Sequence, residues 1–268
     1  MEAPWEIRLC GQLTVRVGDR ALEGAIPGRQ GRLLLAYLVL NRPRACPRTE
    51  LIDLLWPEDP PAAADSALSA LLSKLRRALG PGILSGRAEL RVRLTGRVDV
   101  DVEAAAAAVA AAEAALEERN PAEAAAAARA ALGVDLQTFL PECSGPWVSE
   151  RRGHCESLRL RALESRAVAG IGLGGRELAG AEQAAAAAVA AAPFRESAHR
   201  TLMEVHEAAG NPAEALRAFD TLRVLLRDEL GTSPGPTAMA VHRRLLHGEP
   251  PPVTVAPLAP AGQTWPAA

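Results

Sequence analysis

Residues 65–80 read DSALSALLSKLRRALG, and this stretch decides the fold. Its leucines recur at helical spacing, so they form one apolar stripe that must pack against a core. The opposite side is small, polar and basic, and carries Ser66, Ser69, Ser73 and Arg76, with Lys74 and Arg77 beside them. A helix with such a front can enter the major groove of DNA, where basic side chains reach phosphates or guanine edges. The stretch predicts a recognition helix over about residues 65–79, although a solvated surface helix has the same pattern.

The segments before this helix favour the DNA-binding interpretation. Apolar and polar residues alternate between Ile7 and Val17, which predicts short strands around turns. A helix is expected over residues 33–40. A second helix is expected to start where Thr49 can cap it and to stop at Trp56-Pro57.

We expect the third helix to begin near Asp59-Pro60-Pro61, with a proline in its first turn, and to end at Gly80. Alternating residues between Ile83 and Gly96 then predict a two-stranded hairpin. Strands, three helices and a hairpin, in that order, are typical of a winged helix-turn-helix domain, in which the hairpin is the wing.

Arginines flank the predicted recognition helix on both sides. The start of the second helix, at Arg44, Arg48 and Thr49, combines basic side chains with free N–H groups that suit a phosphate. Wing arginines commonly contact the DNA backbone or the minor groove. Each arginine on its own is equally compatible with plain solvent exposure. We expect Ser66, Ser69, Ser73 and Arg76 to face bases. The residues expected to contact the DNA backbone, from the helices or from the wing, are Arg44, Arg48, Thr49, Lys74, Arg77, Arg87, Arg91 and Arg93.

From Asp101 onward the pattern is helical and rich in alanine, the best helix former. The run Asn-Pro-Ala-Glu-Ala occurs at residues 120–124 and again at 211–215, and a looser copy surrounds residues 174–179. In each copy a helix ends, a tight turn follows and another helix begins. Residues 202–225 fit the tetratricopeptide pattern of paired helices, which stack into a solenoid.

The chain is therefore predicted to be mainly α. A winged helix-turn-helix domain (α+β) is expected over residues 1–99, and an all-α domain of tetratricopeptide-like helical hairpins over residues 100–248. Residues 249–268 are rich in proline and are expected to be disordered. Residues 1–100 carry 15 basic and 11 acidic side chains, and the rest of the chain carries 15 and 21. This asymmetry fits a nucleic-acid module joined to a protein-interaction module.

Catalysis, metal binding and cofactor binding find no support in the sequence. The four cysteines form no CxxC pair, and the five histidines stand in no metal or nucleophile pattern. The glycine-rich run at residues 170–175 is not followed by the Lys-Ser/Thr of a P-loop and is interpreted as a turn between helices. A signal peptide and a membrane-spanning apolar run are both lacking. We expect a cytoplasmic protein with no membrane contact, no catalytic residues, no cofactor and no metal.

Taken together, these motifs resemble the Streptomyces antibiotic regulatory protein family, whose members join an OmpR-like winged helix to a bacterial transcriptional activator domain of tetratricopeptide type. The resemblance covers about residues 5–248. It rests on LIDLLWP at 51–57 and SKLRRALG at 73–80 in the first domain, and on PWV at 146–148, LRLRALE at 158–164, PFRE at 193–196 and LRDELGTSPGP at 226–236 in the second.

The resemblance implies a DNA-binding transcriptional activator, often of secondary-metabolite genes, that binds repeats near a promoter. It implies double-stranded DNA and RNA polymerase as partners. The helical domain is implied to support formation of a homodimer, polymerase contact or the response to an effector.

Two other functions stay open. The chain would be an adaptor without DNA affinity if its winged helix were degenerate. This alternative is favoured by Asp65, whose carboxylate would repel phosphate unless it caps the helix or accepts from a cytosine. It is also favoured by small residues where the family has larger ones, as at Ser69, and by the absence of the aromatic element that usually ends the family's wing. The second alternative is a small-molecule receptor of tetratricopeptide type.

Overall fold

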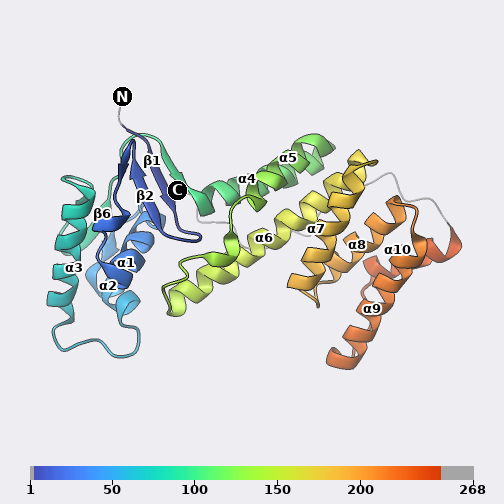
Figure 1. Ribbon diagram of the computed structural model, residues 1–268. Coiled ribbons are helices and arrows are strands. Elements are labelled where there is room, and N and C mark those ends of the chain that lie inside the picture. The colour runs from blue at the N-terminus through green and yellow to red at the C-terminus, as the bar shows by residue number, and fades with distance from the viewer. Residues whose placement is uncertain (1–2, 249–268) are drawn as a thin grey trace. The chain divides into compact units, whose positions relative to one another are not determined.

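The computed structural model describes residues 3–248 of the 268-residue chain (Figure 1). These residues form two compact units. The first unit holds residues 3–104 and 134–156, and the second holds 105–133 and 157–248. The expected domain division at residue 99 stays a prediction, and residues 134–156 are found with the first unit. The predicted disordered tail lies outside the described residues.

The first unit opens with a four-stranded sheet of order β3-β2-β1-β7. β1 (Trp5–Arg8) pairs antiparallel with β2 (Thr14–Val17), which pairs with β3 (Arg20–Ala21). β7 (Val98–Val100) lies parallel to β1. Alternation buries Trp5, Ile7 and Val15 on one face, as the sequence pattern predicts. The sequence pattern does not predict β7, because its partner β1 lies far earlier in the chain and the pairing leaves no local signal.

Three helices and a second small sheet complete the winged helix-turn-helix. A short 3-10 helix (Glu23–Ala25) precedes α1 (Gly28–Leu40), α2 (Arg48–Leu55) and α3 (Ala64–Leu79). The second sheet has the order β4-β6-β5 and consists of β4 (Cys46–Pro47), β6 (Glu89–Val92) and β5 (Leu84–Ser85). β5 and β6 form the predicted hairpin. The order of elements confirms the predicted fold class of this unit.

Two helix starts differ from the prediction. α2 begins at Arg48 behind Pro47, so Thr49 lies inside the first turn and does not cap the helix. α3 begins at Ala64 rather than near Asp59-Pro60-Pro61. A proline disfavours helical backbone in the residue before it, which keeps Asp59 and Pro60 out of the helix.

Seven helices follow β7 in the described chain. They are α4 (Asp101–Glu117), α5 (Pro121–Leu132), α6 (Pro146–Leu173), α7 (Glu177–Ala191), α8 (Glu196–Ala208), α9 (Pro212–Leu230) and α10 (Pro236–His247), with a 3-10 helix (Leu136–Thr138) between α5 and α6. α7 packs on α8, α8 packs on α9, and α10 contacts both α8 and α9. Met203, Phe219 and Leu222 lie in one core cluster of these last helices. Such pairing confirms the predicted helical hairpins.

The repeated Asn-Pro motif starts α5 and α9 as the sequence predicts. Pro121 and Pro212 stand in the first turn, where a missing N–H costs nothing. The side chain of Asn120 also accepts a hydrogen bond from the Glu123 N–H at 3.3 Å. The turn within the glycine-rich run is shorter than expected. Residues 170–173 belong to α6, and the turn itself is Gly174-Gly175.

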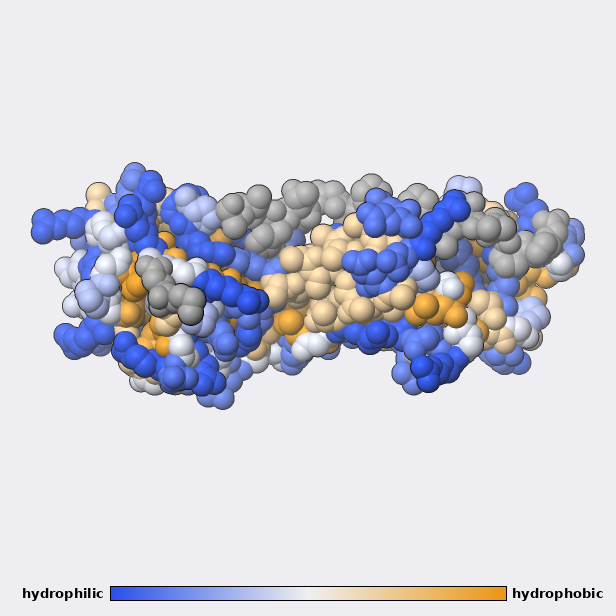
Figure 2. All heavy atoms as spheres, turned by 90° about the horizontal axis from the view of Figure 1, so that it is seen from above, coloured by the Kyte–Doolittle hydropathy of each residue, from blue (hydrophilic) through white to orange (hydrophobic). Residues whose placement is uncertain are grey.

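Alanine shapes both the inside and the outside of the second unit. Ala181, Ala185 and Ala188 of α7 are buried and small enough to let neighbouring helices approach closely. Other alanines point outward, and Figure 2 shows a broad, weakly apolar area in pale orange on one face of the molecule. Exposed alanines of α4 and α5 include Ala107, Ala111, Ala114, Ala122, Ala126 and Ala130.

Candidate nucleic-acid interface

Helix α3 has the two faces that its sequence predicts. Its inner side is apolar, with Leu68, Leu72, Leu75 and Leu79 buried, while Leu71 is only half-buried. Its outer side is open to solvent and carries Ser66, Ser69, Ser73, Lys74 and Arg77. The serines and Arg77 recur three or four residues apart, so they lie along one face of the helix. This face is small and polar over most of its length and becomes basic toward the C-terminus.

The wing is a tight hairpin whose turn depends on one glycine. Gly86 has φ +94°, and a Cβ there would lie 1.8 Å from the carbonyl oxygen of Glu89. Along β6, Leu90 and Val92 are buried while Arg91 is exposed. The turn therefore closes the hairpin tightly enough to bury one face of β6 and present the other.

Five cations of this region are free for a ligand. Within residues 3–248, the side chains of Lys74, Arg77, Arg87, Arg91 and Arg93 form neither a hydrogen bond nor an ion pair with the protein, and all five are exposed. Three of them stand on or next to the wing and two on α3. A phosphate-binding surface needs such uncommitted charges, because a neutralised cation releases no counterion from DNA.

Arg48, at the start of α2, is committed elsewhere. Its Nε lies 2.7 Å from Asp65 Oδ1, and its Nη2 lies 2.9 Å from the Asp65 carbonyl and 2.8 Å from Ser69 Oγ. Its Nη1 lies 3.5 Å from the carbonyl of Arg87 in the wing turn. The Asp65 carboxylate, expected to oppose phosphate, is thus paired with a cation of the protein itself.

Arg76, which the sequence places on the base-reading side, bends toward the wing. Its Nε lies 3.2 Å from the Leu84 carbonyl and its Nη2 lies 2.7 Å from the Gly86 carbonyl. In this structure the guanidinium therefore ties the last turns of α3 to the hairpin.

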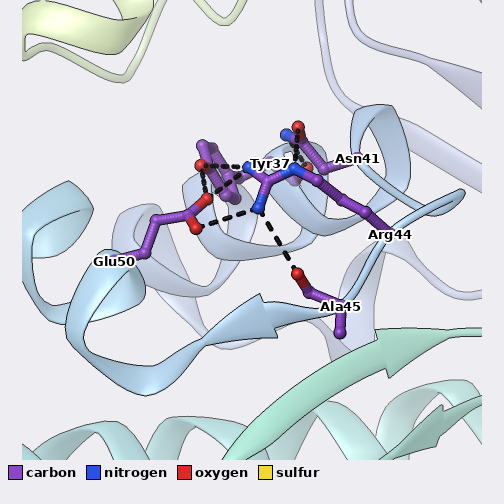
Figure 3. A network of polar contacts seen from close by, with 5 residues as sticks. All are labelled: Tyr37, Asn41, Arg44, Ala45 and Glu50. Carbon is purple, nitrogen blue, oxygen red and sulfur yellow. Dashed lines mark hydrogen bonds and ion pairs between the residues drawn. The ribbon is translucent and has the colours of Figure 1, made fainter.

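Arg44 belongs to a third network, which joins α1 to the start of α2 (Figure 3). Its guanidinium pairs with both carboxylate oxygens of Glu50 and lies 3.0 Å from the Tyr37 hydroxyl, which also donates to Glu50. Burial, and then the bond to Glu50, raises the pKa of Tyr37 to about 12. The bond to Arg44 lowers the pKa of Glu50. The predicted phosphate contact at Arg44 thus has a carboxylate partner, while Thr49 is exposed and open.

Sequence reasoning found the surface positions but missed these partnerships. Arg48 and Asp65 are 17 residues apart, and nothing local in the sequence marks them as a pair. Residues 3–248 contain no cluster of three or more His, Cys, Asp or Glu side chains that could hold a metal ion. Within the same residues, no helix has both the length and the apolar character needed to cross a membrane.

Two family models match the chain. The model described as bacterial transcriptional activator domain matches residues 100–246, and the one described as transcriptional regulatory protein, C terminal, matches residues 28–90. The first covers more than half of the chain, and the second runs from the start of α1 into β6.

Relatives of the chain are named as regulators. Regulatory protein AfsR of Streptomyces coelicolor is 34% identical over 228 residues, which are 82% of this chain and 22% of that protein. Transcriptional regulatory protein EmbR of Mycobacterium tuberculosis is 27% identical over 259 residues, which are 93% of this chain and 65% of that protein. The chain thus spans about a fifth of AfsR and under two thirds of EmbR. The solved structure of Mycobacterium tuberculosis EmbR in complex with a low-affinity phosphopeptide has the same fold, with a TM-score of 0.75 over 94% of this chain and 67% of that one, at 23% identity.

Proposed function

Because the chain belongs to the bacterial transcriptional activator domain family, we propose that it is a DNA-binding transcriptional regulator, and specifically an activator. The observation that carries the proposal is the set of five uncommitted cations on α3 and the wing, next to the exposed serine face of α3. The names of AfsR and EmbR support a regulatory role. Both proteins are longer than this chain. The activity of this chain is therefore part of the proposal and is not taken from theirs.

The residues divide by role. Ser66, Ser69 and Ser73 face the base edges of the major groove, where their small size lets the helix backbone approach. Lys74 and Arg77 bind phosphate beside the helix, and Arg87, Arg91 and Arg93 bind the backbone or the minor groove beside the wing. Thr49 contributes at the N-terminus of α2, where N–H groups point toward an anion.

The helical domain supplies the remaining partners. We propose that it contacts RNA polymerase and supports a homodimer, as the family implies, and that the chain acts in the cytoplasm without catalytic activity of its own. The domain boundaries at residues 99 and 248 belong to the same proposal. An adaptor without DNA affinity is the alternative, and the pairing of Asp65 with Arg48 weakens one of the features that favour it.

The test is the salt dependence of duplex binding. Purified chain is used to select a duplex from a random pool, and its affinity is measured by fluorescence anisotropy at several salt concentrations. We expect affinity to fall steeply with salt. The double variant Lys74→Ala/Arg77→Ala should flatten the slope by about two, one for each phosphate contact. Arg217→Ala, an exposed arginine on α9, is the control and should leave the slope unchanged. Absence of salt-dependent binding by the unaltered chain would favour the adaptor.

A further inference from the structure

Most of the N–H donors of the Arg48 guanidinium bond to other groups of the protein. A guanidinium has five N–H donors. Four of them have an acceptor in the protein: the carboxylate and the carbonyl of Asp65, the hydroxyl of Ser69 and the carbonyl of Arg87. The side chain is only 21% exposed. A residue in this state has little left to offer a phosphate.

The partners of Arg48 belong to the two elements that would contact DNA. Asp65 and Ser69 lie in the first two turns of α3, and Arg87 lies in the wing turn. The backbone N–H of Arg48 also donates to the carbonyl of Ala88, at 3.1 Å. Arg48 therefore fastens the front of α3 and the tip of the wing to the start of α2. Arg76 makes the equivalent connection from the far end of α3 to the carbonyls of Leu84 and Gly86.

We propose that Arg48 is a positioning residue that sets the recognition helix and the wing relative to each other, and that sequence discrimination depends on it although it does not itself bind DNA. This inference rests on the proposed function. Phosphate contacts supply affinity and salt dependence, whereas base contacts supply discrimination and need the helix in one place. Loss of a positioning residue should therefore lower discrimination and leave the salt slope unchanged.

Two variants separate positioning from phosphate contact. The probes are a duplex selected by the unaltered chain and a random-sequence duplex of equal length. Arg48→Ala should reduce the ratio of specific to non-specific affinity by on the order of tenfold, the value of about one base contact, with an unchanged salt slope. Arg91→Ala, which removes a free wing cation, should instead flatten the slope by about one and keep the ratio.

The double variant Arg48→Ala/Asp65→Ala is the charge-balanced form of the test, because Arg48→Ala alone leaves the Asp65 carboxylate without its cation. Under the proposal, the double variant should lower the ratio as Arg48→Ala does. A flatter salt slope with an unchanged ratio for Arg48→Ala, or an unchanged ratio for the double variant, would overturn the proposal.

A measurement without DNA keeps the inference distinct from the proposed function. Amide hydrogen exchange in the second turn of α3 and at residue 48, whose N–H donates to the Ala88 carbonyl of the wing, should become faster in Arg48→Ala. It should not change in Arg44→Ala, whose side chain bonds to Tyr37, Asn41, Ala45 and Glu50 instead. If no duplex is bound but exchange responds as expected, the proposed function fails and the positioning role stands. Unchanged exchange in Arg48→Ala would refute the positioning role itself.

Discussion

The carboxylate of Glu164, on α6, accepts two hydrogen bonds from the guanidinium of Arg195, at the start of α8. The distances are 2.8 Å from Nε and 2.9 Å from Nη2, and the Ser197 hydroxyl donates a third bond at 2.6 Å. The Glu164 side chain is only 1% exposed. A buried carboxylate of this kind is tolerable only with its counter-charge, so the pair commits α6 and α8 to one arrangement.

Replacing Arg195 with Ala should destabilise the second unit strongly. The substitution leaves Glu164 buried with the Ser197 hydroxyl as its remaining partner, which we expect to cost about 3 kcal/mol of unfolding free energy. Urea denaturation monitored by circular dichroism measures it. Arg217→Ala is the matched control, because that arginine is 74% exposed and its pair with Glu214 should contribute less than about 1 kcal/mol. Equal effects of the two substitutions would contradict the conclusion that the buried Glu164 carboxylate depends on Arg195.

The pairing of Glu50 with Arg44 should make stability depend on acid pH. The hydrogen bond from Arg44 holds the pKa of Glu50 below its ordinary value of 4.5 in the folded state. A lowered pKa stabilises the fold above the unfolded value, and this contribution is lost as the pH falls. The advantage of the unaltered chain over Glu50→Gln should therefore be full near pH 7, at about 1 kcal/mol or less because the site is partly exposed, and should shrink below about pH 4.5. Urea titrations across this range measure it, and a difference independent of pH would show that charge is not the cause.

Local sequence patterns predict much of the fold but few of the side-chain contacts at the candidate site. Leucine spacing suffices to find α3 and its outer face, and the Asn-Pro motif suffices to find the starts of α5 and α9. The predicted start of α3 is too early, because the prediction places Pro60-Pro61 in the first turn whereas the helix begins at Ala64. The ion pair of Arg48 with Asp65 and the pairing of β7 with β1 join segments distant in the chain, so neither leaves a periodic signal.

The wing turn should fail if Gly86 receives a side chain. Gly86→Ala would place a Cβ 1.8 Å from the Glu89 carbonyl oxygen at a positive φ, so the hairpin backbone must shift. Gly82 is the matched control, because it also has a positive φ, +81°, but faces open space. We expect Gly82→Ala to cost about 1 kcal/mol, from backbone strain alone, and Gly86→Ala to cost more than about 2 kcal/mol.

Thermal and urea denaturation measure both glycine variants, and DNA affinity reports on the wing. Only Gly86→Ala should weaken duplex binding through a displaced wing. Equal stability losses in the two variants would mean that strain alone matters and that the hairpin can relax around the new methyl group.

Two glycines of the same helix, α6, should respond to alanine in opposite directions. At Gly170 a Cβ would lie 2.6 Å from the Ala181 Cβ and 3.1 Å from the Glu177 carbonyl oxygen, both on or at the start of α7. Gly170→Ala would force α6 and α7 apart and should cost about 1 to 3 kcal/mol. At Gly153 a Cβ meets nothing within 4 Å, so Gly153→Ala should stabilise the helix by up to about 1 kcal/mol through helix propensity alone. Urea denaturation of the two single variants measures both signs. If Gly170→Ala also stabilised the chain, the close approach of α6 and α7 would not depend on this glycine.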